Sequence, residues 1–162
     1  MTYAAPALLT SDQVLERFEC GKPALDDWLR RNALANQISG ATKTWVVVEE
    51  GSLDVVAYYG SSTGSVLRSA ASTRIRRNQP EQIPAIVLAR LAVDNRHKGN
   101  GLGAALLKHF MMKAIEVAGS VGVRTLLIHA KDEEAQAFYR HYGFVESPLD
   151  PLVMMMLLGD IL

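Results

Sequence analysis

The sequence is poor in cysteine and has no excess of either charge. Among its 162 residues Cys20 is the only cysteine, so no disulfide can form within the chain, and this usage is typical of the reducing cytoplasm. Because no histidine or aspartate partner for nucleophilic chemistry is visible, Cys20 is expected to be a small buried hydrophobe. The 17 basic and 17 acidic residues leave a formal net charge of +0, so the composition gives no indication of a nucleic-acid or membrane partner.

Long apolar stretches and metal-ligand patterns are missing as well. The N-terminal residues MTYAAPALLTSDQ contain no basic region and no long apolar run, so we expect no signal peptide. The most apolar segment, LVMMMLL at residues 152–158, is too short to span a bilayer. The four histidines, at positions 97, 109, 129 and 141, lack the spacing of metal ligands, and we expect no metal.

The rest of the composition is that of an ordinary globular chain. Hydrophobic residues make up 49% and charged residues 21%, and the length suffices for a sizeable core. We therefore expect a single domain over residues 1–162. Runs rich in β-branched residues alternate with segments of helical periodicity. This order predicts an α/β fold (mixed α+β), in which a crossover helix joins strands at 83–93 and 123–130.

The first half of the chain predicts a helix followed by a hairpin. A short strand is expected at 6–10. The helix over 25–38, with Pro23 near its start, is indicated by four residues at helical spacings: Leu25, Trp28, Leu29 and Ile38. Strands at 44–50 and 55–60 predict the hairpin, and the small residues SSTGS are expected to interrupt its second strand region.

The second half predicts a basic loop and two helices. The polar segment 68–82, RSAASTRIRRNQPEQ, reads as a loop. A helix over 104–119 follows the central strand, with a face made by Leu102, Leu106, Phe110, Ala114 and Ile115. Asp132 is expected to cap the last helix and Gly143 to end it. One or two strands are expected within 144–158.

A glycine-rich turn lies between the central strand and the long helix. Residues 94–103 read DNRHKGNGLG, in which three alternating glycines follow three potentially basic side chains: Arg96, His97, Lys98, Gly99, Gly101 and Gly103. A helix N-terminus presents unpaired N–H groups and a partial positive charge, and glycine lets a ligand approach the backbone closely. The turn therefore predicts a phosphate or pyrophosphate site, with a tight strand–helix connection as the alternative.

Two common phosphate-binding patterns fit this turn poorly. The Walker pattern G-x-x-x-x-G-K-[ST] does not occur in the chain. The dinucleotide pattern G-x-G-x-x-G/A is formally met by Gly99, Gly101 and Ala104. The acid expected at the end of the next strand, where it would bind a ribose, is missing before Asp132.

The turn and a later segment together carry a family resemblance. Residues 96–101, RHKGNG, match the pattern R/Q-x-x-G-x-G/A, and KDEEAQAFYRHYGF at 131–144 is similar to N-x-x-A-x-x-F-Y-x-x-x-G-F. Both patterns, in this order, are those of the GNAT superfamily of N-acetyltransferases, which the chain resembles. The resemblance implies the GNAT fold, a central, mostly antiparallel mixed sheet with one splayed strand and flanking helices.

The resemblance also implies acetyl-CoA as the acetyl donor and a set of residues that bind it. The turn would hold the pyrophosphate and the strand end the pantetheine arm, through Leu91, Ala92, Val93, Arg96, Lys98, Gly99, Asn100, Gly101, Leu102 and Gly103. The later segment would add Asp132, Ala135 and Phe138. Asp132 stands where the family often has Asn, and helix capping is its alternative role.

Tyr139 is the general acid that the resemblance implies. A phenol with a reference pKa of about 10 stays protonated at neutral pH, and the family places it near the CoA sulfur. The alternative is a packing aromatic on a helix face. No general base emerges from the sequence, and the candidates left open are His129, His141 and a bound water.

The N-terminal half narrows the resemblance to one branch. The segments FECGKPALDDWLRRNALANQISGATKTWVVV, YYGSSTG and STRIRRNQPEQIPAIVLARLAVD are similar to the toxins of type II toxin–antitoxin modules. This implies acetylation of the α-amino group of the amino acid on charged tRNA, a ribbon–helix–helix antitoxin as partner, and often a homodimer. Six arginines are compatible with tRNA phosphates: Arg30, Arg31, Arg74, Arg76, Arg77 and Arg90.

Other functions stay open at this point. The arginines could be ordinary solvated side chains, and they do not form a large cluster. The acceptor could be a small amine, although the basic segment 68–82 does not suit a cationic substrate. The chain could also be a CoA-binding interaction module, with the segment 152–158 as a partner surface rather than a strand.

Overall fold

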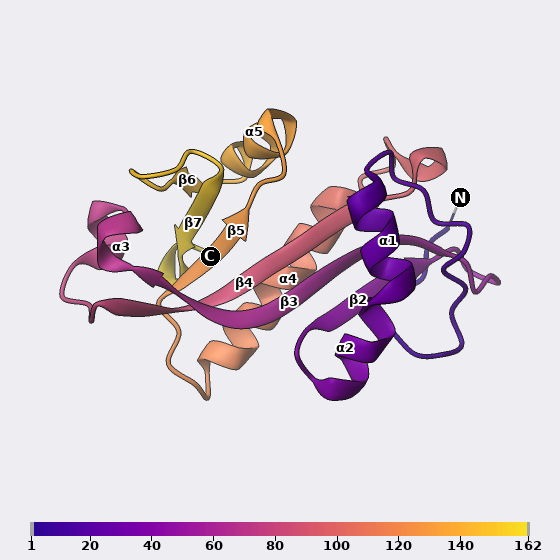
Figure 1. Ribbon diagram of the computed structural model, residues 1–162, viewed down its shortest axis with the longest axis horizontal. Coiled ribbons are helices and arrows are strands. Elements are labelled where there is room, and N and C mark those ends of the chain that lie inside the picture. The colour runs from indigo at the N-terminus through magenta and orange to yellow at the C-terminus, as the bar shows by residue number, and fades with distance from the viewer. Residues whose placement is uncertain (1, 162) are drawn as a thin grey trace. The chain divides into compact units, whose positions relative to one another are not determined.

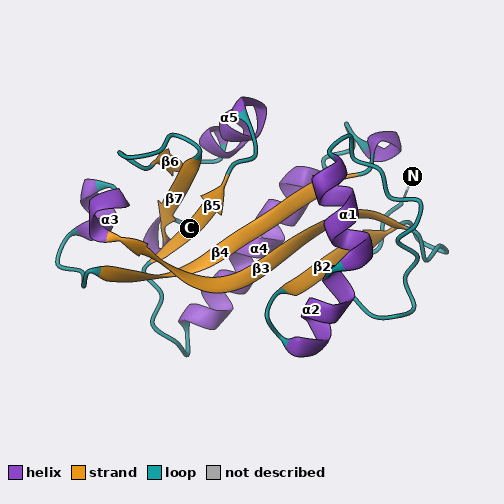
Figure 2. Ribbon diagram, in the orientation of Figure 1, coloured by secondary structure: helices purple, strands orange, loops and turns teal. Residues whose placement is uncertain are grey.

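The protein, described by a computed structural model over residues 2–161, contains a seven-stranded mixed sheet (Figures 1 and 2). The strands lie in the order β1-β2-β3-β4-β5-β7-β6. They are β1 (Ala7–Leu8), β2 (Lys43–Val48), β3 (Val55–Leu67), β4 (Gln82–Val93), β5 (Thr125–His129), β6 (Val145–Glu146) and β7 (Val153–Leu157). The helices are α1 (Pro23–Arg31), α2 (Ala33–Ser39), α3 (Thr73–Arg76), α4 (Leu102–Ala118) and α5 (Glu133–His141), with 3-10 turns η1 (Arg68–Ala70), η2 (Asn95–His97) and η3 (Leu158–Asp160). The predicted α/β class is confirmed.

The chain divides into two units, and β3, β4 and α4 each pass from one unit into the other. The first unit contains the chain up to Ser62 together with Ala89–Phe110. The second contains Thr63–Leu88 together with the residues from Met111 onward. Consequently β1, β2, α1 and α2 belong to the first unit, and α3, β5, α5, β6 and β7 belong to the second.

In the first unit the predicted hairpin separates two layers of side chains. β2 and β3 pair antiparallel, and successive strand residues point to opposite faces, so Tyr58 and Tyr59 enter different layers. Tyr58 packs in a core with Leu29 of α1 and with Cys20, which is buried as predicted. On the opposite face the Tyr59 ring lies 5.9 Å from that of Phe110 in α4. Figure 1 shows α1 and α2 beside β2 and β3.

The single helix predicted over 25–38 is in fact two helices. Pro23 occupies the first turn of α1, as its position predicted. The backbone leaves helical geometry at Asn32, where φ is −120° and ψ is −27°. Because α2 starts afresh after this break, Ile38 does not continue the apolar face that contains Leu29. Ile38 is 80% exposed, so the prediction of one face running through it is wrong.

The second unit is built on the predicted crossover. β4 and β5 pair in parallel from Ala85 with Thr125 to Leu88 with Ile128, and α4 connects them. β7 pairs antiparallel with β5 and with β6. The core of this unit joins apolar residues of β3, β4, β5, β7 and α3, among them Val66, Ile75, Ile83, Leu127 and Met155. Figure 2 shows α3 and α5 together with these strands.

The small residues SSTGS do not interrupt the strand, and β3 continues without a break from Val55 to Leu67. A Cβ added to Gly64 would come within 2.9 Å of a methyl group of Val87 on β4. Glycine therefore marks a close approach between neighbouring strands, which sequence alone does not distinguish from a strand end. The predicted interruption is wrong.

The segment 68–82, predicted to be a loop, is partly helical. It contains η1 and α3 before β4 begins at Gln82. Ile75 is 1% exposed and packs into the core of the second unit. The Arg124 side chain donates hydrogen bonds to the carbonyls of Arg74 (3.0 Å) and Ile75 (3.2 Å). One buried residue in a polar segment produces no periodicity, which explains why the helix was not predicted.

The C-terminal segment, for which one or two strands were expected, forms two, β6 and β7. The apolar run at 152–158 is β7, in which Met154 and Met155 are fully buried. It is therefore a core strand of the second unit and not a free partner surface. Within residues 2–161, no helix has both the length and the apolar character needed to cross a membrane.

Candidate active site

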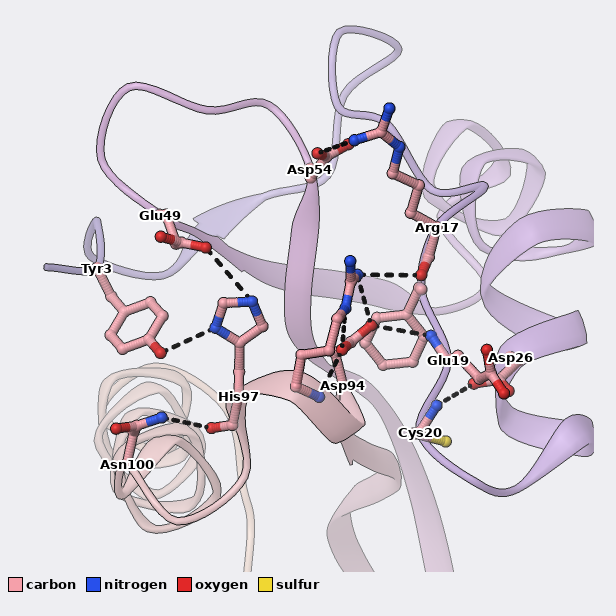
Figure 3. A network of polar contacts seen from close by, with 12 residues as sticks. Tyr3, Arg17, Glu19, Cys20, Asp26, Glu49, Asp54, Asp94, His97 and Asn100 are labelled. Atoms are coloured by element: carbon pink, nitrogen blue, oxygen red, sulfur yellow. Dashed lines mark hydrogen bonds and ion pairs between the residues drawn. The ribbon is translucent and has the colours of Figure 1, made fainter. Parts of the chain in front are cut away.

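The glycine-rich turn begins at Asp94, which directly follows β4 in the first unit. Asp94 is 1% exposed, and its carboxylate accepts hydrogen bonds from the amides of Glu19 (3.0 Å) and Arg96 (2.9 Å) and from Arg96 Nε (3.0 Å) (Figure 3). Burial by itself would raise the pKa of Asp94, but the hydrogen bonds and the Arg96 charge outweigh it and hold the pKa below its usual value. Asp94 is thus an ionised anchor for the turn.

Two basic side chains of the turn hold the loop that precedes α1. Arg96 Nη2 donates to the Arg17 carbonyl at 3.3 Å, in addition to the ion pair of Arg96 with Asp94. Lys98 Nζ donates to the Cys20 carbonyl at 2.9 Å. Both charges lie at the rim of the turn and are engaged with protein groups. A ligand at this turn would therefore be bound first by backbone N–H groups.

Gly99 and Gly101 determine the shape of the turn. Their φ angles are 85° and 77°, a region that L side chains rarely adopt. A Cβ built at either position would meet no heavy atom within 4 Å, so backbone conformation rather than crowding requires glycine. Residues 98–101 are exposed, and the 17-residue helix α4 begins directly after them. Exposed amides at the start of a long helix fit a pyrophosphate.

The predicted pantetheine contacts come from the end of β4 in the same unit. Ala92 is 3% exposed and packs in the core with Tyr58, whereas Leu91 and Val93 are half-buried. All cofactor residues predicted between Leu91 and Gly103 therefore belong to the first unit. Their contact with acetyl-CoA stays a prediction.

The remaining cofactor candidates and Tyr139 belong to the second unit, on α5 and its cap. The Asp132 side chain accepts a hydrogen bond from the Ala135 amide at 2.8 Å, which confirms its capping role. Gly143, with φ of 97°, follows the end of the helix as predicted. Phe138 is half-buried, with its ring 5.3 Å from that of Tyr139.

Tyr139 is buried, and its hydroxyl makes no hydrogen bond to any group within the described residues. It is 6% exposed, and its ring meets Phe144 edge-on at 6.0 Å. Burial raises the pKa of the Tyr139 phenol, and the negative charge of Asp132 raises it further. Within residues 2–161, no group forms a hydrogen bond with this hydroxyl. The phenol is therefore protonated and available to a bound molecule.

The other two buried tyrosines of the described chain differ from Tyr139 in this respect. Burial raises the pKa of Tyr58 as well, but its hydroxyl donates to the Leu25 carbonyl at 2.7 Å. The Tyr59 hydroxyl lies 2.7 Å from His109 Nδ1. Burial thus raises the pKa of both Tyr58 and Tyr139, and what distinguishes Tyr139 is that its hydroxyl has no hydrogen-bond partner among residues 2–161.

Three of the six candidate tRNA-binding arginines lie in the first unit. Arg30 donates to the Phe18 carbonyl at 2.6 Å and pairs with Asp27 at 3.4 Å, and Arg31 is exposed. Arg90 is half-buried on β4, and burial lowers its pKa. No carboxylate among residues 2–161 forms an ion pair with Arg90.

The other three lie in and after α3, in the second unit. Arg74 is engaged with both carboxylate oxygens of Asp160, at 2.7 and 3.2 Å. Arg76 and Arg77 are exposed, and their guanidinium groups have no partner in the described part of the chain. Of these three arginines, Arg74 is held by a carboxylate, whereas Arg76 and Arg77 are unpaired within residues 2–161. That any of the six binds tRNA stays a prediction.

The four histidines, all within the described residues, differ in exposure, and only His97 is buried. His97 is 7% exposed, and its interactions with Tyr3 and Glu49 were not predicted, because no local spacing links residues so distant in sequence. His129 and His141, the candidate bases, are both exposed. In the part of the chain that the structure describes, no three His, Cys, Asp or Glu residues come together as metal ligands.

Comparison with known proteins identifies relatives over nearly the whole chain. The chain is 42% identical over 158 residues to the tRNA-acetylating toxin of Mycobacterium tuberculosis (strain ATCC 25618 / H37Rv), covering 98% of this chain and 94% of that protein. The structure of AtaT complexed with acetyl-methionyl-tRNAfMet matches with a TM-score of 0.90 at 25% identity, covering 98% of this chain and 96% of AtaT. AtaTR bound with AcCoA matches with a TM-score of 0.85 at 26% identity, covering 99% and 96%.

A match to a protein-family model agrees with these similarities. The acetyltransferase (GNAT) domain matches residues 41–146, which include the glycine-rich turn, α5 and Tyr139. Both segments that carried the resemblance in the sequence lie inside this match, one in each unit. The chain therefore belongs to the GNAT family of acetyltransferases.

Proposed function

We propose that this acetyltransferase transfers an acetyl group to the α-amino group of the amino acid on charged tRNA and so acts as a toxin. The observation that carries the choice of acceptor is the 42% identity, over 98% of the chain, with a protein named tRNA-acetylating toxin. The likeness to AtaT complexed with acetyl-methionyl-tRNAfMet supports the same class of acceptor. An acetylated α-amine cannot attack a peptidyl ester, so translation would stop.

Acetyl-CoA is the donor in this proposal, supported by the likeness to AtaTR bound with AcCoA. When bound, it supplies a thioester carbonyl that an amine attacks and a thiolate that leaves. The backbone amides of residues 98–103 would hold its pyrophosphate, and the end of β4 its pantetheine arm. The two positive φ angles and the exposure of this turn fit that role. Asp132, Ala135 and Phe138 are the proposed contacts from α5.

Tyr139 is the proposed general acid. Its phenol keeps its proton because burial raises its pKa, and its hydroxyl has no partner within residues 2–161. It would donate this proton to the departing thiolate, a contribution of about 10²–10⁴-fold for a positioned acid. A backbone N–H near Val93 would stabilise the oxyanion. The α-amine of an aminoacyl ester has a lowered pKa, so a water can accept its proton.

The partners and location in this proposal follow from the resemblance of the sequence. We propose a ribbon–helix–helix antitoxin as partner, a homodimer, and a cytoplasmic location, where charged tRNA is present. We also propose that residues 1–162 work as one catalytic domain, because β3, β4 and α4 each run through both units. Arg31, Arg76, Arg77 and Arg90 are the arginines we expect to contribute most to tRNA binding, since Arg30 and Arg74 have carboxylate partners.

The decisive experiment is acetyl transfer from labelled acetyl-CoA to total charged tRNA, with the same tRNA deacylated as the control. Label on the charged pool alone supports the proposal, and digestion then identifies the amino acid. The Tyr139→Phe variant should bind CoA normally and transfer the label about 10²-fold more slowly or worse. Label on free polyamines or amino acids and none on tRNA would contradict the tRNA acceptor and support a small-amine acetyltransferase.

A further inference from the structure

The buried imidazole of His97 connects the glycine-rich turn to two distant parts of the first unit. His97 Nδ1 lies 2.9 Å from the Tyr3 hydroxyl, and His97 Nε2 lies 3.3 Å from a carboxylate oxygen of Glu49 (Figure 3). The rings of Tyr3 and His97 also meet edge-on, with 5.7 Å between their centres. His97 is 7% exposed, so the imidazole makes these contacts largely shielded from water.

One neutral tautomer satisfies both partners of the imidazole. A carboxylate only accepts hydrogen bonds, so the nitrogen facing Glu49 carries the proton. In the neutral imidazole the nitrogen facing Tyr3 carries no proton and can accept the hydrogen bond that the phenol donates. The result is a directed chain from Tyr3 through His97 to Glu49. Each of the three side chains has a defined role in it.

Tyr3 and Glu49 are themselves fixed by backbone pairing. They face each other in an antiparallel bridge beside the end of β2. The Ala4 amide donates to the Val48 carbonyl at 2.9 Å, and the Glu50 amide donates to the Thr2 carbonyl at 3.0 Å. The side chains of Tyr3 and Glu49, which hold the imidazole, therefore project from backbone that is itself hydrogen-bonded.

His97 is directly joined to the residues that would bind the pyrophosphate. Its amide donates to the Asp94 carbonyl at 2.9 Å, and its carbonyl accepts a hydrogen bond from Asn100 Nδ2 at 3.0 Å. The next residues include Gly99 and Gly101, whose lack of a Cβ makes the free turn conformationally permissive. A turn of this kind binds an anion tightly only if other contacts hold its amides in place beforehand.

We propose that His97, held by Tyr3 and Glu49, is a positioning residue that pre-organises the glycine-rich turn for the pyrophosphate of CoA. This inference rests on the proposed binding of acetyl-CoA at the turn. It makes the N-terminal segment around Tyr3 a determinant of cofactor affinity, although Tyr3 lies 94 residues from His97 in sequence. His97 does not take part in acetyl transfer itself, so its removal should change CoA affinity and leave kcat at saturating acetyl-CoA unchanged.

Three variants and one matched control test the proposal, with the dissociation constant of CoA measured by calorimetry on the full chain. Tyr3→Phe removes the hydrogen bond to His97 and should weaken CoA binding about fivefold. His97→Ala removes the whole imidazole and should weaken it about tenfold. His97→Gln should lie near wild type, because an amide can donate to Glu49 and accept from Tyr3. The control is Tyr59→Phe, which removes a tyrosine–histidine contact of 2.7 Å to His109 on α4. It should lower the melting temperature and leave CoA affinity unchanged.

Weaker CoA binding in Tyr3→Phe and His97→Ala, with kcat retained, supports the proposal. Unchanged CoA affinity in folded Tyr3→Phe overturns it, even where His97→Ala does not fold. An equal loss of affinity in Tyr59→Phe also overturns it, because general destabilisation would then explain the effect. If the wild-type chain binds no CoA, the proposed donor site fails and this inference fails with it. If CoA binding behaves as expected but charged tRNA takes no label, only the proposed acceptor fails.

Discussion

The guanidinium carbon of Arg90 lies 4.2 Å from the centre of the Trp28 ring. Trp28 in turn stacks on Tyr58, with 6.1 Å between ring centres and 11° between planes. The cation on β4 is thus placed by an aromatic pair from α1 and β3 rather than by a carboxylate, and its charge is not cancelled by a partner within residues 2–161. An arginine held in this way can present its charge to a phosphate.

Replacing Arg90 should weaken tRNA recognition without affecting the donor. In Arg90→Ala the KM for charged tRNA should rise about tenfold, and the slope of log affinity against log salt should fall by about 1, since one phosphate contact is lost. Arg90→Lys keeps a charge and should retain most of the salt dependence. The control is Arg17→Ala, which removes an exposed arginine of the same unit that pairs with Asp54 at 3.4 Å. An unchanged salt slope in Arg90→Ala would exclude Arg90 from the tRNA contact.

The arginines of the 68–82 segment should differ in their effect on tRNA. Arg76→Gln and Arg77→Gln together should raise the KM for charged tRNA and lower the salt slope by about 2, because both side chains are exposed and unpaired within the described chain. Arg74→Gln should have a smaller effect, because Arg74 already pairs with Asp160. Steady-state transfer at several salt concentrations measures both. A larger effect from Arg74 would mean that its ion pair opens to bind tRNA.

Alanine at Gly101 should damage the donor site selectively. The φ angle of 77° costs an L residue about 1–2 kcal/mol, so Gly101→Ala should shift the turn and weaken CoA binding about tenfold. Gly40→Ala is a matched control, since Gly40 has φ of 84° in the same unit and ends α2, away from the turn. Calorimetric titration with CoA distinguishes the two. Equal affinities for CoA in both variants would contradict the assignment of the turn.

Asp94 should make the protein sensitive to acid. Its pKa is lower in the folded chain than the ordinary value of 3.8, so folding favours the ionised form. The stability that this provides is present above the unfolded value and is lost as the pH falls through the folded value. In Asp94→Asn this part of the pH dependence should disappear, and the free energy of unfolding should be lower at neutral pH. Urea titrations between pH about 7 and 3 measure it, and identical profiles for wild type and variant would rule out Asp94 as the anchor.

Tyr139 should keep its proton well into the alkaline range. Burial and then the Asp132 charge raise its pKa above the ordinary value of 10.0, so the phenol should not ionise with the exposed tyrosines. The difference between the tyrosinate absorbance of wild type and Tyr139→Phe should therefore be flat up to pH about 10. A step in that difference at the ordinary tyrosine value would show that the acid is not shielded as described.

The sequence by itself determined the family and those local elements whose start and end carry clear signals. The glycine alternation at 99–103, the capping Asp132 and the terminating Gly143 predicted a strand–turn–helix and the last helix, because these signals depend on near neighbours in the chain. The two patterns that identified the GNAT family are also local. Tyr139 was singled out in the same way, from its place within the second pattern.

The tertiary structure alone decided which side chains are engaged and which remain available. The continuation of β3 through Gly64 depends on Val87 of a neighbouring strand, and the helix in the basic segment depends on the burial of Ile75. Likewise, Arg74 is paired because Asp160 reaches it, and His97 is held because Tyr3 and Glu49 meet beside β2. These relationships join residues far apart in sequence, where no periodicity or spacing records them, so only folding brings their charges and hydrogen-bonding groups together.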